Sequence, residues 1–254
     1  MAKLSVNDLE KIKTESAPAI AFQDRTYCLI CGGTGCHATG SIAVKIALEQ
    51  EIAAKGIADR VKVVETGCNG FCAMGPLLVV HPGDIFYQKL TEDDIPELVE
   101  SQLVKGQTVE RLLYKDPVSK KRIACQNDIP FFAHQMPRAL RNKGLINPEE
   151  INDYISRDGY LGAARALFEM TPEEITEQMK ISGLRGRGGA GFPTGVKWDF
   201  ARKSGGADKF VLCNADEGDP GAFMDRSILE ADPHAVLEGM VVAAKAIASN
   251  QGYI

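Results

Sequence analysis

The stretch from Gly183 to Trp198 contains six glycines, two arginines, one lysine and the only tryptophan of the chain. Between Gly183 and Lys203 there are five basic residues and a single acidic one, Asp199. Glycines allow backbone amides to approach a ligand closely, and the surrounding positive charge favours an anion. The stretch therefore predicts a loop that holds the phosphate of a cofactor.

This glycine loop contains the pattern Gly186-x-Gly188-x-x-Gly191, which formally matches the dinucleotide-binding fingerprint. That fingerprint requires a hydrophobic strand directly before it. Residues 171–180 instead begin with a threonine, a proline and two acids, which is typical of a capped helix start. An ordinary Rossmann turn is therefore disfavoured. A flexible linker is disfavoured too, because aromatic residues lie within and just after the loop.

A short apolar segment, Lys209–Cys213, is followed by Asn214, Asp216, Glu217 and Asp219. Ligands usually lie at the carboxyl ends of strands in an α/β sheet. An amide can donate to and accept from the edge of a heterocycle, and carboxylates accept hydrogen bonds from ribose or ribityl hydroxyls. This acidic cluster is a candidate cofactor site, and the alternative is a solvated acidic turn.

Two motifs in these segments resemble one family. They are S-G-L-R-G-R-G-G-A-G-F-P-T-G-x-K-W at Ser182–Trp198 and C-N-A-D-E-x-x-P-G-x-F-x-D-R at Cys213–Arg226. Over residues 128–254 the chain resembles the flavin-bearing, NADH-oxidising subunit of respiratory complex I and its relatives in NAD(P)-linked hydrogenases and formate dehydrogenases. The resemblance implies FMN as the cofactor and NAD(P)H as the substrate.

The resemblance also implies which residues contact these ligands. The positions that match the family's flavin contacts are Gly186, Gly188, Lys197, Asn214, Asp216 and Glu217. The nicotinamide would stack between the isoalloxazine ring and the aromatic residues Phe192 and Phe200, with Gly189 and Asp219 also on its side. Asp219 stands where respiratory members commonly have a glutamate. The choice between NADH and NADPH stays open, because no residue that selects the ribose is identifiable.

Four cysteines near the amino terminus form a second constellation, with C-x4-C at Cys31 and Cys36 and C-x3-C at Cys68 and Cys72. Four thiolates can ligate a [2Fe-2S] cluster, two to each iron. The intervening glycines allow loop amides to donate hydrogen bonds to cluster sulfurs. Zinc also takes four cysteines, but its structural sites usually contain C-x2-C pairs, so this spacing fits zinc less well.

The only C-x2-C pair is Cys28 with Cys31, and Cys28 lies in the apolar run 26–30, which predicts a buried core thiol. A redox-active dithiol is a further interpretation of this pair. It requires a helix directly after the first cysteine. Two glycines, a threonine and another glycine follow instead, and the next helical pattern begins only near Ser41. Dithiol chemistry is therefore disfavoured.

The segments around the cysteines predict a compact α/β domain. We expect strands at residues 26–30, 60–66, 77–81 and 85–90, and helices at residues 41–55 and 93–104, the second capped by Thr91. This order resembles the thioredoxin-like [2Fe-2S] ferredoxin, whose ligands would be Cys31, Cys36, Cys68 and Cys72. In the beta subunits of multimeric [FeFe] hydrogenases that domain is fused ahead of the flavin domain, and the order here is similar.

The predicted fold class is α/β, in two domains. A thioredoxin-like [2Fe-2S] domain is expected at residues 1–108, a linker at 109–145, and the amino-terminal part of an FMN-binding, Rossmann-like α/β domain at 146–254. A helix at 235–248 is expected to end the chain with no further strand, so that the chain reads as an amino-terminal fragment. In the family a helical bundle with a [4Fe-4S] cluster follows later in the sequence.

Composition excludes other classes. The net charge is −5 and no basic cluster occurs outside the glycine loop, which argues against nucleic-acid binding. No apolar run approaches the roughly 18 residues of a membrane-spanning helix. No targeting signal is visible, and seven cysteines in two metal-like pairs plus scattered singles fit a reducing cytoplasm better than a disulfide framework.

The expected function is that of an electron-transfer subunit. Hydride would be exchanged between NAD(P)H and FMN, and single electrons would pass to iron-sulfur clusters, with no side-chain acid or base involved. The expected partners are other subunits of a hydrogenase, formate dehydrogenase or NADH dehydrogenase complex, and the fragment alone is expected to be inactive. The alternative is a non-enzymatic, zinc-stabilised module that senses nucleotides and assists assembly.

Overall fold

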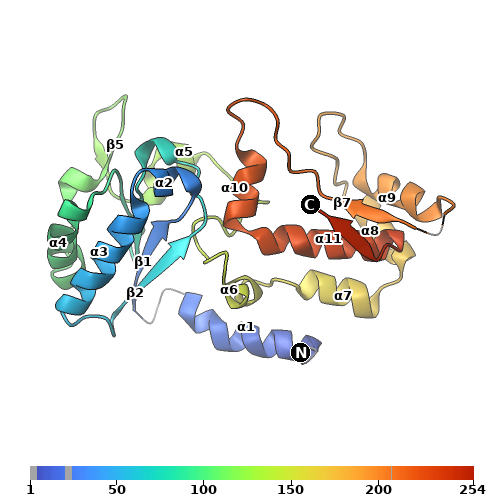
Figure 1. The fold of residues 1–254 in the computed structure, drawn as a ribbon, viewed down its shortest axis with the longest axis horizontal. Coiled ribbons are helices and arrows are strands. Elements are labelled where there is room, and N and C mark those ends of the chain that lie inside the picture. Colours follow the sequence, from blue (N-terminus) through green and yellow to red (C-terminus); the bar gives the residue numbers. More distant parts are fainter. Residues whose placement is uncertain (1–4, 21–24, 207) are drawn as a thin grey trace.

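The computed structural model describes residues 5–20, 25–206 and 208–254. Its amino-terminal half contains a four-stranded sheet in the order β2-β1-β3-β4 (Figure 1). The strand β1 (Thr26–Cys31) pairs in parallel with β2 (Val61–Thr66) and antiparallel with β3 (Leu78–His81), which pairs antiparallel with β4 (Ile85–Tyr87). All four strands expected from the sequence are confirmed, although β4 ends earlier, at Tyr87.

Helices α2 (Thr34–Ala38) and α3 (Ser41–Ala54) connect β1 to β2. Helix α3 confirms the expected helix, but α2 lies where we expected a loop. Gly33 adopts an extended conformation before α2, and its carbonyl accepts the backbone N–H groups of Cys36 and His37. The glycines therefore precede a short helix, which glycine content alone did not indicate.

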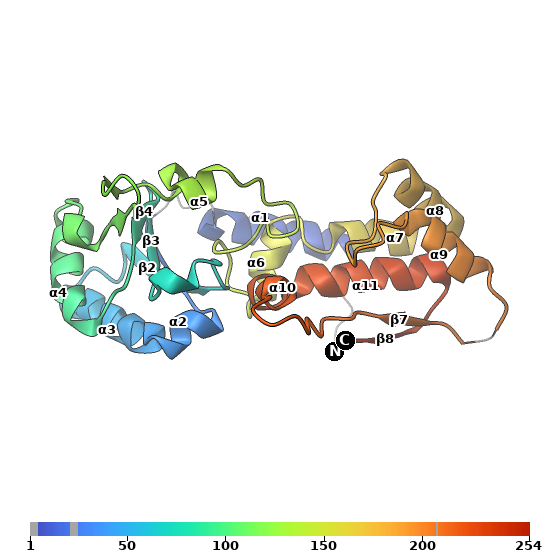
Figure 2. The ribbon, with the colours of Figure 1, turned by 90° about the horizontal axis from the view of Figure 1, so that it is seen from above.

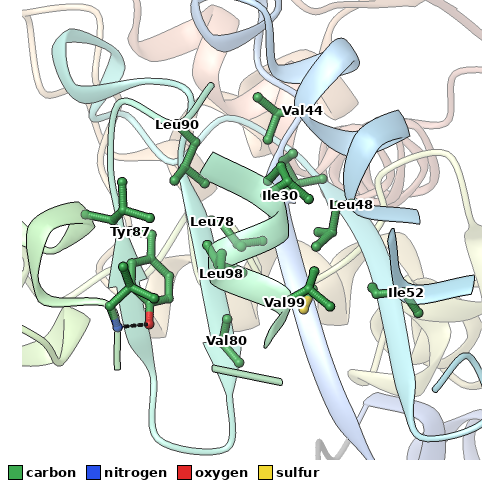
Figure 3. Close-up of a cluster of buried hydrophobic side chains, with 14 of the residues drawn as sticks. Ile30, Val44, Leu48, Ile52, Leu78, Val80, Tyr87, Leu90, Leu98 and Val99 are labelled. Atoms are coloured by element: carbon green, nitrogen blue, oxygen red, sulfur yellow. Dashed lines mark hydrogen bonds between the residues drawn. The ribbon is translucent and has the colours of Figure 1, made fainter. Parts of the chain in front are cut away.

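The two faces of the sheet carry separate cores because successive side chains of a strand point to opposite faces. Cys28 and Ile30 lie with the inner residues of α3 and of α4 (Ile95–Leu98) in one core, which Figure 3 shows. Tyr27, Leu29 and Cys31 belong to the other core. Cys28 is fully buried, and burial raises its pKa to about 12. Its predicted role as a core thiol is confirmed.

The helix expected at 93–104 is divided. It begins as the 3₁₀ turn η2 (Glu92–Asp94), continues as α4 and ends as the π turn η3 (Val99–Val104). Thr91 caps it as expected, since its backbone N–H and its hydroxyl each donate to Asp94 Oδ2 at 2.8 Å. The carboxylate in turn completes a capping box with Thr91.

Much of the segment expected to be a linker packs against the sheet. It contains η4 (Glu110–Leu112), the hairpin β5 (Tyr114–Lys115) and β6 (Arg122–Ile123), η5 (Gln126–Asp128) and α5 (Pro130–Ala133). Leu112 and Leu113 enter the core beneath α3, and Tyr114 and Ile129 enter the opposite core. The domain boundaries stay a prediction, but residues up to Phe132 contribute to the amino-terminal core.

The carboxyl-terminal half is mainly helical. Its elements are α6 (Ile151–Ser156), α7 (Leu161–Glu169), α8 (Pro172–Ile181), α9 (Thr194–Lys203), β7 (Phe210–Leu212), α10 (Met224–Ala231), α11 (Pro233–Ile247) and β8 (Gln251–Tyr253). Helix α1 (Val6–Ile20) packs along α6, and Lys13 pairs with Asp158 at 2.7 Å. Figures 1 and 2 show α10 between the sheet and the long helix α11. No described helix combines the length and hydropathy needed to cross a membrane.

The expectation that no strand follows the last helix is wrong. β8 pairs in parallel with β7, and the connection between the two strands contains the helices α10 and α11. A strand of three residues gives too short an alternation to be recognised in the sequence. Although β7 is an apolar segment, Phe210 is 48% and Leu212 73% exposed. The reason is that β7 pairs only with β8 within the described part of the chain.

Candidate cofactor sites

The four predicted cysteine ligands lie together: Cys31 ends β1, Cys36 lies in α2, and Cys68 and Cys72 lie in the segment after β2. Cys31, Cys36 and Cys68 are buried, and Cys72 is partly buried. The sulfurs of Cys68 and Cys72 are 3.9 Å apart, and that of Cys31 interacts with those of Cys36 and Cys68. The structure therefore brings the whole predicted quartet together. Cys28, on the opposite face of the sheet, is not part of it.

Backbone amides of the second cysteine loop point at these sulfurs. Asn69 N–H donates to Cys31 Sγ at 3.4 Å, and Gly70 N–H donates to Cys68 Sγ at 3.3 Å. Such bonds stabilise the thiolate form and tune a bound cluster. Gly70 has φ of +72°, a conformation that favours glycine.

Three glycines pack directly against the cysteines, where a larger residue would push a cysteine aside. A methyl group at Gly33 would lie 2.6 Å from Cys68 Cβ, and one at Gly75 would lie 2.7 Å from Cys36 Sγ. At Gly35 it would lie 3.1 Å from Cys72 Cβ. Small residues on every side of the quartet are what a bulky inorganic core between the thiolates requires, so these residues fit a [2Fe-2S] cluster.

The cysteine sulfurs lie close enough to shift one another's pKa. A hydrogen bond to Cys36 raises the pKa of Cys31 to about 11, and the same contact lowers the pKa of Cys36. Burial raises the pKa of Cys72. A thiol that coordinates a metal cation releases its proton. The four cysteines can therefore all be thiolates only when metal cations are bound between them. Among the described residues no group of His, Cys, Asp or Glu is arranged to hold a single metal ion.

The glycine loop lines a cavity of about 620 Å³. Four of the predicted ligand-binding residues contribute to its wall, namely Gly186, Gly188, Phe192 and Lys197. The opposite wall comes from β7 and from Ala243 and Ile247 of α11. A cavity of this size is within the range that cofactors occupy.

The glycine loop is fastened at its base and open at its tip. Gly186 N–H donates to the Phe192 carbonyl and Thr194 N–H to the Leu184 carbonyl, each at 2.9 Å. The capped helix α8 leads into the loop, as expected, and no strand precedes it. Gly189 has φ of +98°, and a methyl group at Gly188 or Gly189 would meet nothing within 4 Å. The backbone at the tip is therefore free to approach a ligand.

Helix α9 begins directly after the loop, so its first amides lie beside the cavity. Part of the positive charge counted in the sequence is used within this helix. Asp199 pairs with Lys203 at 2.7 Å and with Arg202 at 2.9 Å. The Lys203 ammonium and the Arg202 guanidinium hold the pKa of this carboxyl well below its usual range. Lys197 is the cation of α9 that lines the cavity.

The acidic cluster does not line the cavity. Asn214 Oδ1 accepts the backbone N–H of Asp216 at 3.1 Å, which closes a local turn. Glu217 accepts the backbone N–H groups of Asp225 at 2.8 Å and Arg226 at 3.0 Å, and so caps α10. Burial alone would raise the pKa of Glu217, but these hydrogen bonds lower it overall. This capping role was not expected from the sequence.

Phe192 and Phe200, the predicted stacking partners of the nicotinamide, lie close to each other, but only Phe192 lines the cavity. The ring centroids of Phe192 and Phe200 are 6.4 Å apart with an interplanar angle of 48°. Phe200 is 63% exposed and, like Gly189 and Asp219, is not part of the cavity wall. Trp198 and the two α11 residues in the wall were missed, because their position depends on how α11 packs.

One helix connects the two sites. Asp232 at the start of α11 is fully buried and accepts a 2.6 Å hydrogen bond from Asn142 Nδ2. Residue Gly144 lies against the side chain of Asn69, between the cysteines. Further along α11, Ala243 faces the cavity, about 16 Å from Asp232 at the helical rise per residue. A continuous path of packed residues therefore runs from the cysteine loop to the cavity.

Family models match both halves of the chain. Residues 21–102 match the thioredoxin-like [2Fe-2S] ferredoxin, and residues 179–254 match the Nuo51 FMN-binding domain. The chain thus combines a thioredoxin-like [2Fe-2S] ferredoxin domain with part of an FMN-binding domain. FMN and a [2Fe-2S] cluster are the cofactors of these domains, and neither match supports the zinc-stabilised alternative.

The chain is also similar to individual proteins. It is 52% identical to the NADP-reducing hydrogenase subunit HndC of Solidesulfovibrio fructosivorans over 47% of this chain and 24% of that protein. It is 49% identical to an NADH-quinone oxidoreductase subunit of Rhizobium meliloti over 46% of this chain and 28% of that protein. The matched segment thus spans about a quarter of each relative's length. Among solved structures, the thioredoxin-like [2Fe-2S] ferredoxin of Aquifex aeolicus aligns with 35% of this chain and 95% of its own, at 30% identity and a TM-score of 0.33.

Proposed function

We propose that this chain is part of an oxidoreductase subunit that exchanges hydride between NAD(P)H and FMN and delivers single electrons to iron-sulfur clusters. The observation that carries the proposal is that the same chain contains a cysteine quartet and a glycine-lined cavity. Residues in contact with one another connect the two sites. The matches to a [2Fe-2S] domain and an FMN-binding domain support it.

In the proposed arrangement the loop amides of Gly186 and Gly188 and the ammonium of Lys197 hold the FMN phosphate. FMN, when bound, accepts two electrons together and returns them one at a time. Phe192 and Phe200 would flank the nicotinamide, with Gly189 and Asp219 on its side. Asn214, Asp216 and Glu217 belong to the proposed flavin site as the resemblance implies, and Glu217 would also position α10 through its capping hydrogen bonds.

The proposed cluster ligands are Cys31, Cys36, Cys68 and Cys72. The amides of Asn69 and Gly70 donate to the cysteine sulfurs and would hold them in place as electrons arrive and leave. The proposed partners are other subunits of a hydrogenase, formate dehydrogenase or NADH dehydrogenase complex in the cytoplasm. A [4Fe-4S] cluster would belong to a part of the protein outside this chain.

The test uses the intact protein, loaded with FMN and clusters under anaerobic conditions. NADH and NADPH are supplied in separate assays, and reduction of an artificial one-electron acceptor is followed. The proposal predicts FMN-dependent reduction with at least one of the two nucleotides, and the comparison of the two defines the specificity. No reduction with either nucleotide, in protein that has bound FMN, would overturn it. The 254-residue chain alone is expected to show no turnover.

A further inference from the structure

The cysteine quartet is covered by residues from outside the four-stranded sheet. A methyl group at Gly70 would lie 2.2 Å from Lys143 Nζ, so the Lys143 ammonium rests directly on the second cysteine loop. Gly144, at φ of +71°, fits against Asn69, where a methyl group would lie 2.2 Å from its Oδ1. The segment 142–145 therefore forms a cover over the loop that carries Cys68 and Cys72.

Helix α10 makes a second contact with the segments that carry the cysteines. A methyl group at Gly67 would lie 2.2 Å from Ala231 Cα, so helix and loop touch through their backbones. The hydroxyl of Thr34 donates to the Glu230 carboxylate, which also pairs with Arg226 at 3.0 Å. The positive charge of Arg226 is therefore balanced locally by an acid.

Lys143 differs from Arg226 in this respect. Within the described part of the chain Lys143 forms no salt bridge with a carboxylate, and the thiols of Cys68, Cys72 and Cys31 are ionisable groups close enough to influence it. Burial lowers the pKa of Lys143, and these sulfurs, as anions, oppose that effect. The Lys143 ammonium on the cysteine loop is therefore placed to interact with the negative charge that the cysteines hold once they ligate a cluster.

We infer that Lys143 is a positioning residue for the cluster: its ammonium group raises the reduction potential of the cluster. Reduction of the cluster in turn holds the segment 142–145 more firmly against the cysteine loop. This inference rests on the proposed function. The step is a one-electron reduction, with the electron supplied from NAD(P)H through the flavin, and no bond breaks. The added negative charge is attracted to the nearby cation, so reduction is favoured.

Two consequences follow from the same interaction. Removing the charge should make the cluster harder to reduce. Because coupling between two equilibria is reciprocal, reduction should stabilise the cover by the same free energy by which the cover favours reduction. The second consequence is measurable without any substitution.

The first experiment measures the midpoint potential of the reconstituted chain by spectroelectrochemistry. Lys143→Met removes the charge and keeps the length, Lys143→Arg keeps the charge, and Lys121→Met removes an exposed charge from the β5–β6 turn. We expect Lys143→Met to lower the one-electron equilibrium constant about tenfold, which is about 59 mV. Lys143→Arg should leave the equilibrium constant within about threefold because the charge is kept. Lys121→Met should do the same because an exposed and distant charge is screened.

The second experiment measures amide hydrogen exchange in the unsubstituted chain, oxidised and reduced. Exchange of the amides of Lys143 and Leu145, which donate to Leu140 and Asn142, should slow on reduction. An unchanged potential in Lys143→Met, or equal exchange in both redox states, would overturn the inference while leaving the proposed function intact. If the chain assembles no [2Fe-2S] cluster, the proposed function fails first and the inference falls with it.

Discussion

The cysteine site and the glycine-loop site use glycine for opposite purposes. Around the cysteines, Gly33, Gly67 and Gly75 are closely surrounded, and a single methyl group would overlap a neighbour. At the tip of the glycine loop, Gly188 and Gly189 have open space around them. The first set holds two parts of the protein in contact. Gly188 and Gly189 leave the backbone of the loop exposed, as the close approach of a ligand requires.

The contrast extends to burial. Cys31 ends a strand whose two faces are both covered by apolar side chains, and Cys36 and Cys68 are buried beside it, so the fold itself holds them. The cavity beside β7 has an exposed strand as one wall and an exposed aromatic residue, Phe192, in its lining. Substitutions at the first site should therefore affect assembly and stability, and substitutions at the second should affect ligand affinity alone.

The largest expected effect is at the cysteines. Cys68→Ala removes one of four thiolates, so the reconstituted chain should lose its iron, since [2Fe-2S] clusters need all four ligands. Iron and acid-labile sulfide per chain are the measured quantities. Cys28→Ala is the matched control, because Cys28 is equally buried but lies on the opposite face of the sheet. Iron retained in Cys68→Ala, or lost in Cys28→Ala, would contradict the assignment.

Contact between the cysteine loop and α10 gives the next largest effect. Gly67→Ala would place a methyl group 2.2 Å from Ala231 Cα, so the helix must move. The free energy of unfolding should fall by about 1–3 kcal/mol in urea denaturation. Gly239→Ala is the control, since Gly239 lies exposed in α11 with nothing within 4 Å of the added methyl. It should stabilise the helix by up to about 1 kcal/mol, and equal effects of both would refute the close contact.

Lys197→Met tests the glycine-loop site. Loss of a charged hydrogen-bond donor to phosphate should weaken FMN binding about 10- to 100-fold, with little change in unfolding. Isothermal titration of the apoprotein with FMN measures this. Lys203→Met on the same helix is the control, because Lys203 pairs with Asp199 and does not line the cavity. Similar losses in both variants would mean that general positive charge, and not this position, attracts the flavin.

The smallest effect is expected at the helix caps, where the two halves should behave alike. Thr91→Ala and Thr171→Ala each remove a capping box and should each cost about 1 kcal/mol in thermal unfolding. Hydrogen bonds from Thr171 lower the pKa of Glu174 below its usual 4.5. The stabilisation by Glu174 is therefore present at neutral pH and lost as the pH falls through that lowered value. The part of the Thr171→Ala cost that depends on the Glu174 carboxylate should be lost in strong acid, whereas the part from the Glu174 N–H bond to the Thr171 hydroxyl should remain. A Thr171→Ala cost that does not change with pH would contradict this.

The sequence predicted those features of both halves whose signals lie within a few neighbouring residues. The strands at Thr26–Cys31 and Val61–Thr66 are apolar runs, and the capping boxes at Thr91 and Thr171 are complete within four residues. The glycine loop and its cavity-lining residues Gly186, Gly188, Phe192 and Lys197 followed from a compact motif.

What the sequence did not predict depends on contacts between distant residues. Helix α10 was missed because it starts within a polar segment and is capped by Glu217, eight residues before Asp225. β8 has only three residues and exists through its pairing with β7. The proximity of Lys143 to Gly70 joins positions far apart in the chain, and no pattern in either segment indicates the other.

The most direct test is a composition measurement on the 254-residue chain and on the intact protein, each reconstituted anaerobically with iron, sulfide and excess FMN and then freed of unbound ligands. We expect two irons and two sulfides per 254-residue chain, no stoichiometric zinc and, in the intact protein, bound FMN that Lys197→Met reduces without loss of iron. A chain that takes up zinc in place of iron, and an intact protein whose flavin content does not respond to Lys197→Met, would contradict these expectations.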